Sequence, residues 1–265
     1  MSEDLEELQL LAEQAARLGG QILQEWAPRF TSREKSPANL VTEADEASQQ
    51  AIFDLIHSRC PEHRFLGEEG LLQDAGDSPW RWIIDPLDGT SNYVHRFPYY
   101  AVSIGLERAG ALVVGVIFDP NRDEMFSARL DGGATLNGAA IGPSVESEIG
   151  RAMCMASLPV KAKREHPAVQ RFLKVLDHAQ TVQRTGSAAL NLCCVACGRI
   201  DAFWSSSLKP WDQAAGALIV QESGGRVTKA DRSLFDVDKP DLLATNGSAL
   251  HATIGALLCD GGTAD

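Results

Sequence analysis

A change of hydrophobic pattern near residue 150 constrains the fold of this 265-residue chain more than any other feature. Between residues 99 and 141, short apolar runs follow one another with turn residues between them, which predicts an antiparallel meander. After residue 151, short apolar runs alternate with segments of helical periodicity, which is typical of a mainly parallel sheet flanked by helices. The strands predicted in the meander are residues 101–107, 112–118 and 124–128, with a hairpin turn at Asn137-Gly138.

The segment before the meander is predicted to be mainly helical. Apolar residues recur at helical spacing over residues 5–26, and Thr42 with Asp45 forms the pattern of a capping box that begins a second helix ending near Ser58. Residues 31–41 show neither period and are predicted to be a loop. Further strands are predicted at residues 63–66, 82–84, 152–156, 181–184, 201–204 and 242–245, and further helices at residues 165–178, 186–197, 211–223 and 249–258.

No Ser/Gly-rich linker, low-complexity segment or internal repeat separates the two patterns. We therefore expect one compact unit made of two closely packed halves, which agrees with the chain length. Residues 1–150 are expected to hold the antiparallel sheet and most of the acidic motifs described below. Residues 151–265 are expected to form an α/β half that completes the site.

The charge balance argues against whole classes of partner. The chain carries 24 basic and 36 acidic residues, and no basic run offsets the net charge of −12, so neither nucleic acid nor an anionic membrane is expected to bind. The longest aliphatic run, residues 111–118, is far shorter than the ~20 residues of a membrane helix, and the acidic N-terminus is unlike a secretory signal. The six cysteines lack disulfide spacing, so we expect reduced thiols and a cytoplasmic location.

The most informative motif is an apolar strand that runs directly into Asp85-Pro-Leu-Asp88-Gly-Thr90. Pro86 is expected to end strand pairing, so that Asp85 and Asp88 converge at the carboxyl end of the strand. Two converging carboxylates repel each other unless a cation lies between them, and oxygen ligands of this kind suit Mg²⁺. The backbone N–H groups of Gly89 and Thr90 would then be available to a phosphate group.

Two other acidic segments, Gly67-Glu68-Glu69 and Trp211-Asp212, also lie at the ends of apolar elements. Each segment alone has an ordinary explanation, because an isolated Asp-rich turn or a Glu pair is usually solvated surface. The conjunction favours a site, since the predicted topology brings the ends of these elements together.

The motifs resemble those of the inositol monophosphatase family of Mg²⁺-dependent, lithium-sensitive phosphatases. Residues 82–95 (WIIDPLDGTSNYVH) look like the first family signature, and residues 211–225 (WDQAAGALIVQESGG) resemble the second. Residues 40–45 (LVTEAD), 67–69 (GEE) and 185–191 (TGSAALN) match other family segments in the same order, so the resemblance covers nearly the whole chain. It implies a layered αβαβα sandwich and a homodimer.

The resemblance also implies a set of metal ligands, which bind two to three Mg²⁺ ions in the family. Asp85 would bridge two ions, and a third, weaker ion would lie near Glu68. The implied ligands are Glu68, Asp85, the backbone carbonyl of Leu87, Asp88 and Asp212.

Other residues match the family's catalytic and substrate-binding positions. Asp45 and Thr90 resemble the pair that orients the attacking water, and Glu69 would assist them. Ser205 occupies a position where inositol phosphatases usually carry a Glu that binds ring hydroxyls, so selectivity for inositol is expected to be shallow. The implied substrate contacts are Asp88, Gly89, Thr90, Gly186, Ser187, Ala188, Ser205, Lys209 and Asp212.

These observations predict a Mg²⁺-dependent phosphomonoesterase for small polyol or sugar phosphates, in which metal-activated water attacks the phosphate. The default substrate is myo-inositol 1-phosphate. Histidinol phosphate, fructose 1,6-bisphosphate and nucleotide 3′-phosphates stay open as alternatives within the same fold. A regulatory binding module without catalysis is the alternative from another class, and the complete set of acidic residues argues against it.

Overall fold

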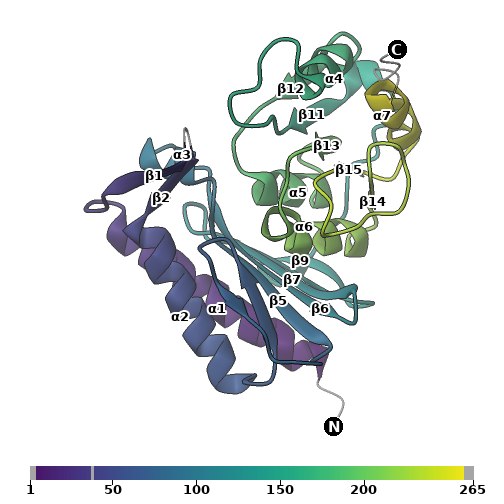
Figure 1. Cartoon of the computed structure of the whole chain (residues 1–265). Coiled ribbons are helices and arrows are strands. Elements are labelled where there is room, and N and C mark those ends of the chain that lie inside the picture. The colour runs from purple at the N-terminus through teal and green to yellow at the C-terminus, as the bar shows by residue number, and fades with distance from the viewer. Residues whose placement is uncertain (1–3, 37–38, 260–265) are drawn as a thin grey trace.

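The computed structural model describes residues 4–36 and 39–259, which stack in five alternating layers of helix and sheet (Figure 1). One pair of helices covers the outer face of a large sheet, a second pair separates it from a smaller sheet, and a third pair covers the smaller sheet's outer face. This arrangement confirms the predicted αβαβα sandwich. In layer order the helices are α1 (Leu5–Trp26) with α2 (Glu43–Arg59), α5 (Ala188–Ala196) with α6 (Pro210–Glu222), and α4 (Pro167–Leu176) with α7 (Leu250–Cys259).

The large sheet has the strand order β10-β9-β8-β7-β6-β5-β3-β4. The strands from β5 to β10 pair antiparallel with their neighbours, so the predicted meander is confirmed, and β3 joins β5 in parallel. The bounds are β3 (Arg64–Gly67), β4 (Leu72–Gln73), β5 (Trp80–Asp88), β6 (Ala101–Arg108), β7 (Ala111–Asp119), β8 (Glu124–Arg129), β9 (Gly133–Leu136) and β10 (Ala139–Ala140).

The smaller sheet has the order β12-β11-β13-β15-β14, and four of its five strands run in one direction, as predicted, whereas β15 runs in the opposite direction. β11 pairs in parallel with β12 and β13, whereas β15 is antiparallel to both β13 and β14. Helix α6 connects two strands of the same direction, β13 and β14, and β15 fills the space between them. The three-residue β14 is too short to show a sequence period. The bounds are β11 (Met153–Ala156), β12 (Thr181–Gln183), β13 (Ala202–Ser205), β14 (Arg226–Thr228) and β15 (Leu242–Thr245).

Two local predictions in the first half are wrong. The segment expected to be a loop at residues 31–41 contains an antiparallel hairpin of β1 (Ser32–Ser36) and β2 (Asn39–Thr42), which backbone pairing creates without an apolar pattern. Pro86 does not end β5, because the strand has an irregularity between Asp85 and Asp88 and pairing with β6 resumes at Asp88. A proline within such an irregularity costs no ladder hydrogen bond.

The capping box that begins α2 is confirmed. The backbone N–H of Thr42 donates to Asp45 Oδ2 at 2.9 Å, and the Thr42 hydroxyl accepts from the N–H groups of Ala44 and Asp45. Because Thr42 is also the last residue of β2, the box fixes where the hairpin joins the helix. It therefore fixes the position of Asp45 as well.

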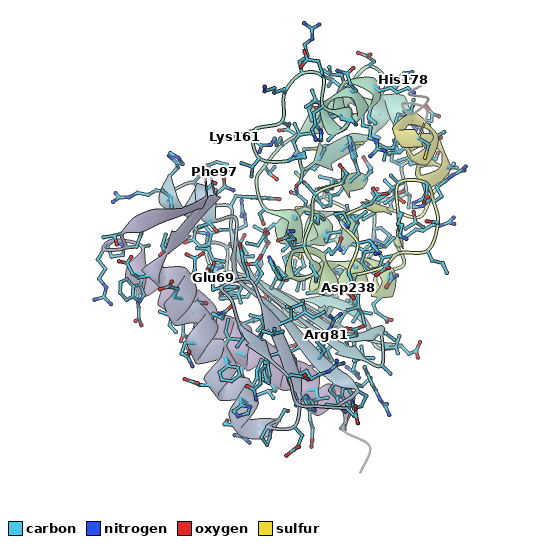
Figure 2. All side chains as sticks on the ribbon, viewed as in Figure 1. Glu69, Arg81, Phe97, Lys161, His178 and Asp238 are labelled. Atoms are coloured by element: carbon cyan, nitrogen blue, oxygen red, sulfur yellow. The ribbon has the colours of Figure 1, made fainter. Side chains whose placement is uncertain are left out.

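Close packing of α6 on the large sheet sets the position of its first turn. A Cβ atom at Gly115 on β7 would lie 2.5 Å from the carbonyl oxygen of Ala215, so only glycine permits this approach. Arg81 on β5 adds an ion pair at 3.2 Å to Asp238 in the loop before β15, and both residues are labelled in Figure 2. We propose that residues 1–150 and 151–265, each containing one of the two larger sheets, are two halves of one unit.

All six cysteines lie within the described ranges, and each is a free thiol there. No helix in the described part of the chain combines the length and the apolar character needed to cross a membrane.

Candidate active site

The acidic motifs meet in a cavity of about 500 Å³ between the two halves. β5 and α3 (Thr90–Val94) supply one wall, and the turn before α5 with the first turn of α6 supplies the other. Of the residues predicted from sequence, the cavity is lined by Glu68, Asp85, Leu87, Asp88, Gly89, Thr90, Gly186, Ala188 and Asp212.

Three carboxylates form the centre of this cavity. Asp85 and Asp88 come from the end of β5, Asp212 comes from the first turn of α6, and one carboxylate oxygen of each lies within 4.8 Å of the others. Glu68 also lines the cavity, from the turn that joins β3 to β4. The tertiary fold therefore brings together acids that are up to 144 residues apart in sequence (212 − 68).

Burial raises the pKa of all three aspartates, and the charges of neighbouring acids raise it further at Asp85 and Asp212. The pKa of Asp85 is raised well above its usual value by burial and then by the charges of Glu68, Asp88 and Asp212. Burial raises the pKa of Asp88 to about 6, and burial with the charge of Asp88 raises that of Asp212 to about 8. A bound cation would relieve this repulsion, and an all-oxygen donor set fits a hard ion such as Mg²⁺.

The hydrogen bonds around Asp88 show a second role for its carboxylate. It accepts from the hydroxyl of Ser187, from the N–H of Ala188 at 3.3 Å and from the N–H of Ala189 at 2.9 Å. These donors form the N-terminus of α5, so Asp88 connects the end of β5 to the helix between the sheets. Ser187 is fully buried against Asp88 and, unlike Gly186 and Ala188, is not part of the cavity lining.

Thr90 and Asp45 lie next to each other, as the sequence predicted. Asp45 Oδ2 accepts from the N–H and hydroxyl of Thr42, while Asp45 Oδ1 is 3.4 Å from Thr90 Oγ1. The Thr90 hydroxyl is also 3.2 Å from the carbonyl oxygen of Leu87. Asp45 is buried behind the cavity, whereas Thr90 lines it. The contact with Asp45 therefore orients the Thr90 hydroxyl, which can contact a group bound in the cavity.

Gly89 makes the turn between β5 and α3. Its φ of +98° belongs to the left-handed region that favours glycine, and a Cβ atom there would lie 3.0 Å from the carbonyl oxygen of Tyr99. This turn places Thr90 at the first position of α3, directly after the two aspartates.

Besides Asp45 and Ser187, three residues predicted from sequence lie outside the cavity lining: Glu69, Ser205 and Lys209. Ser205 is buried at the end of β13, and Ser207, two residues later, lines the cavity instead. Lys209 is exposed, but its backbone N–H donates to Asp212 Oδ2 at 2.7 Å and so holds that carboxylate. The backbone of Glu69 is bonded to the side chain of Gln49 on α2.

Sequence reasoning missed Asn92, Arg184, Ser207 and the loop at 157–160, all of which line the cavity. Asn92 donates to the carbonyl oxygens of Tyr99 at 2.7 Å and Thr185 at 2.9 Å, which connects α3 to the opposite half. Asn92 lies inside the motif of residues 82–95, and this position could have identified it from the sequence. The loop at 157–160 carries no motif and could be found only from the structure.

A buried group of carboxylates suits a divalent cation, and the adjoining turn suits a phosphate group. The fold and the cavity together therefore define the class of protein as a metal-dependent hydrolase of phosphate esters.

Comparisons with known proteins agree with this class. The model of the inositol monophosphatase family matches residues 4–262. Inositol monophosphatase 2 of Solanum lycopersicum is 40% identical over 264 residues, which cover 96% of this chain and 98% of that protein. Nus factor SuhB of Escherichia coli K12 is 36% identical over 222 residues, which cover 82% and 83% of the two chains.

A solved structure gives the same result at the level of the fold. The inositol monophosphatase from Anabaena (Nostoc) sp. PCC 7120 superposes with a TM-score of 0.88 at 34% identity and covers 99% of both chains. The chain belongs to the inositol monophosphatase family, whose members are metal-dependent phosphoric monoester hydrolases.

Proposed function

We propose that the chain hydrolyses small polyol or sugar phosphates in a Mg²⁺-dependent reaction, with myo-inositol 1-phosphate as the default substrate. The observation that carries the proposal is the buried group formed by Asp85, Asp88 and Asp212 within one cavity. The names of relatives such as inositol monophosphatase 2 of Solanum lycopersicum support the choice of substrate.

The proposed metal site takes its ligands from both halves of the chain. Two or three Mg²⁺ ions would be held by the carboxylates of Glu68, Asp85, Asp88 and Asp212 and the carbonyl oxygen of Leu87. When bound, such ions neutralise phosphate charge and lower the pKa of water.

The remaining groups would bind and orient the reactants. Thr90, fixed by its 3.4 Å contact to Asp45, would direct the attacking water towards phosphorus, with Glu69 assisting from the neighbouring turn. The backbone N–H groups of Gly89 and Thr90 would bind phosphate oxygens. Gly186 and Ala188 would contact the leaving group from the opposite wall of the cavity.

The choice among substrates depends on the wall that faces the leaving group. Its lining includes Ser207, Leu208 and Arg184, and Ser205 lies behind them. In the described cavity lining, the acidic residues are the four proposed metal ligands, so no further carboxylate is available there to select ring hydroxyls. Histidinol phosphate, fructose 1,6-bisphosphate and nucleotide 3′-phosphates therefore belong in the same test as inositol 1-phosphate.

The test is phosphate release from this panel with added Mg²⁺ or with EDTA. We expect Mg²⁺-dependent release from inositol 1-phosphate, with other polyol phosphates within about tenfold in kcat/KM. Release that is unchanged by EDTA would overturn the metal assignment. Release confined to one of the alternative esters would overturn the substrate assignment.

A cytoplasmic location, a homodimer and inhibition by lithium complete the proposal, and each rests on the family resemblance or on the free cysteines. The second candidate function is a regulatory binding module without catalysis, which the name of the relative Nus factor SuhB supports. Absence of phosphate release from every ester of the panel would favour that second role.

A further inference from the structure

We propose that Gln49 on α2 is a positioning residue that fixes the Glu68 carboxylate in the cavity. The inference rests on the proposed metal site and adds a residue that lies outside every motif recognised in the sequence. Gln49 is buried, with 8% of its surface exposed, and it faces the turn that carries Glu68. It does not line the cavity, so it would act through that turn.

The amide of Gln49 binds the backbone of the turn twice. Gln49 Nε2 donates to the carbonyl oxygen of Glu69 at 3.2 Å, and Gln49 Oε1 accepts from the Glu69 N–H at 3.0 Å. The side-chain amide thus pairs with both polar groups of one residue, as a neighbouring strand would. Glu68, the residue before, points into the cavity and raises the pKa of Asp85.

Gly67, on the other side of Glu68, packs against the same amide. A Cβ atom at Gly67 would overlap Gln49 Oε1 and would lie 3.0 Å from the Cβ of Leu71. The Gly67 N–H donates to the carbonyl oxygen of Leu71 at 2.8 Å, and the Glu68 N–H donates to that of Ile84 at 3.2 Å. Contacts of Gln49 on both sides of Glu68 therefore leave its backbone little freedom.

Helix α2 also contacts the segment that carries Asp85, Asp88 and Thr90. Asp45, Ser48 and Gln49 lie on one buried face of the helix. Asp45 contacts Thr90, and the hydroxyl of Ser48 donates to the carbonyl oxygen of Pro86 at 3.2 Å. One helix face thus holds each of the two acidic segments from the N-terminal half, and Gln49 is its link to Glu68.

The test compares Gln49→Leu with Gln50→Leu, a matched control at an exposed neighbour whose side chain bonds only Asp54 among the described hydrogen bonds. Mn²⁺ binding to the substrate-free proteins is measured by electron paramagnetic resonance. Groups that orient metal ligands typically contribute about 10–100-fold to metal affinity, so Gln49→Leu should bind Mn²⁺ that much more weakly, while Gln50→Leu matches the wild type.

Two further measurements separate positioning from a general loss of structure. Amide exchange at Glu69 should speed up in Gln49→Leu without a change at the opposite end of α2. The Mg²⁺ concentration for half-maximal kcat should rise by the same factor as the Mn²⁺ dissociation constant, with substrate KM at saturating Mg²⁺ unchanged. Unchanged Mn²⁺ affinity despite faster exchange at Glu69 would overturn the proposal.

Gly67→Ala tests the same contact from the other side if Gln49→Leu fails to fold. With Gln49 retained, this variant should bind Mn²⁺ more weakly than the wild type, and equal affinity would count against the proposal. If the wild type binds Mn²⁺ but releases no phosphate from any ester, the proposed function fails, whereas the effect of Gln49 on metal affinity is still measured.

Discussion

Asp85 and Asp88 are three residues apart and have different surroundings. The carboxylate of Asp85 accepts one described backbone hydrogen bond, from Leu87 at 3.0 Å, and otherwise faces other acids. The carboxylate of Asp88 accepts two backbone hydrogen bonds and one from the Ser187 hydroxyl, all from the N-terminus of α5. A substitution at Asp85 should therefore affect mainly the proposed metal, whereas a substitution at Asp88 should affect the metal and the fold together.

At a pH above the raised pKa of Asp85, Asp85→Asn should raise the melting temperature of the metal-free protein, because it removes a buried charge that other carboxylates repel. The same variant should lose most activity and the stabilisation by Mg²⁺, which mass action sets at about 2.7 kcal/mol when the ion is at 100 times its dissociation constant. Thermal melting with EDTA and with Mg²⁺ measures both effects. Asp88→Asn is the comparison and should lower the metal-free melting temperature. Equal Mg²⁺ stabilisation of Asp85→Asn and the wild type would contradict the assignment.

Thr90→Ala tests the orienting role separately from metal binding. Positioned acid–base groups contribute ~10²–10⁴-fold, so kcat should fall within that range while substrate KM and Mg²⁺ stabilisation change little. Thr90→Ser retains the hydroxyl and should keep most activity. Steady-state kinetics on the three proteins decides the matter. A raised KM with normal kcat would make Thr90 a substrate-binding residue instead.

At the scale of elements, the turn between β13 and α6 controls which serine faces the cavity. Ser205 ends the strand with 2% of its surface exposed, and its hydroxyl accepts from the N–H of Ser207 at 3.3 Å. Ser207 then reaches the cavity lining. The position expected to control specificity therefore moves from Ser205, as the sequence indicated, to Ser207.

Ser207→Glu should raise kcat/KM for inositol 1-phosphate, because a carboxylate in the cavity can accept hydrogen bonds from ring hydroxyls. One such charge-assisted bond contributes roughly 1.5–3 kcal/mol, which is about a 10–100-fold gain. Ser205→Glu should instead lower the melting temperature, since it buries a carboxylate without a described partner. Kinetics and melting of both variants measure the difference. A gain in selectivity from Ser205→Glu alone would show that the strand end opens towards the substrate.

At the scale of the whole molecule, acidic residues are buried where the two halves meet. Because of this burial, the free energy of unfolding depends on both the pH and the bound metal. The folded protein raises the pKa of Asp88 to about 6 and that of Asp212 to about 8, and the same burial raises that of Asp85. A raised pKa means that the folded state binds more protons than the unfolded state between those values. Each aspartate with a raised pKa therefore stabilises the folded state below its ordinary pKa near 4. This stabilisation is lost as the pH rises through the pKa of that aspartate in the folded state.

The metal-free protein should therefore become less stable from about pH 5 to about pH 8, and Mg²⁺ should stabilise it more at the higher pH, where the aspartates are ionised. Melting temperatures across this range with EDTA and with Mg²⁺ test the prediction. NaCl at matched ionic strength controls for screening. A Mg²⁺ effect of the same size at both ends of the range would contradict the prediction.

The sequence alone determined the features that depend on neighbours within a few residues. The helix over residues 5–26, the Thr42–Asp45 capping box and the meander follow from periodicity, capping and turn residues, all of which are local. The family motifs likewise identified Asp85, Asp88 and Asp212, because each motif is contiguous in the chain.

The tertiary structure alone decided the features that depend on residues far apart in the chain. One such feature is the position of β15 between β13 and β14, antiparallel to both. Likewise, the bonds from α5 to Asp88 join residues 99 to 101 positions apart, and those from Gln49 to Glu69 join residues 20 apart. Periodicity reports which face of an element is buried, but the partner on that face depends on how the layers stack, which no local pattern encodes.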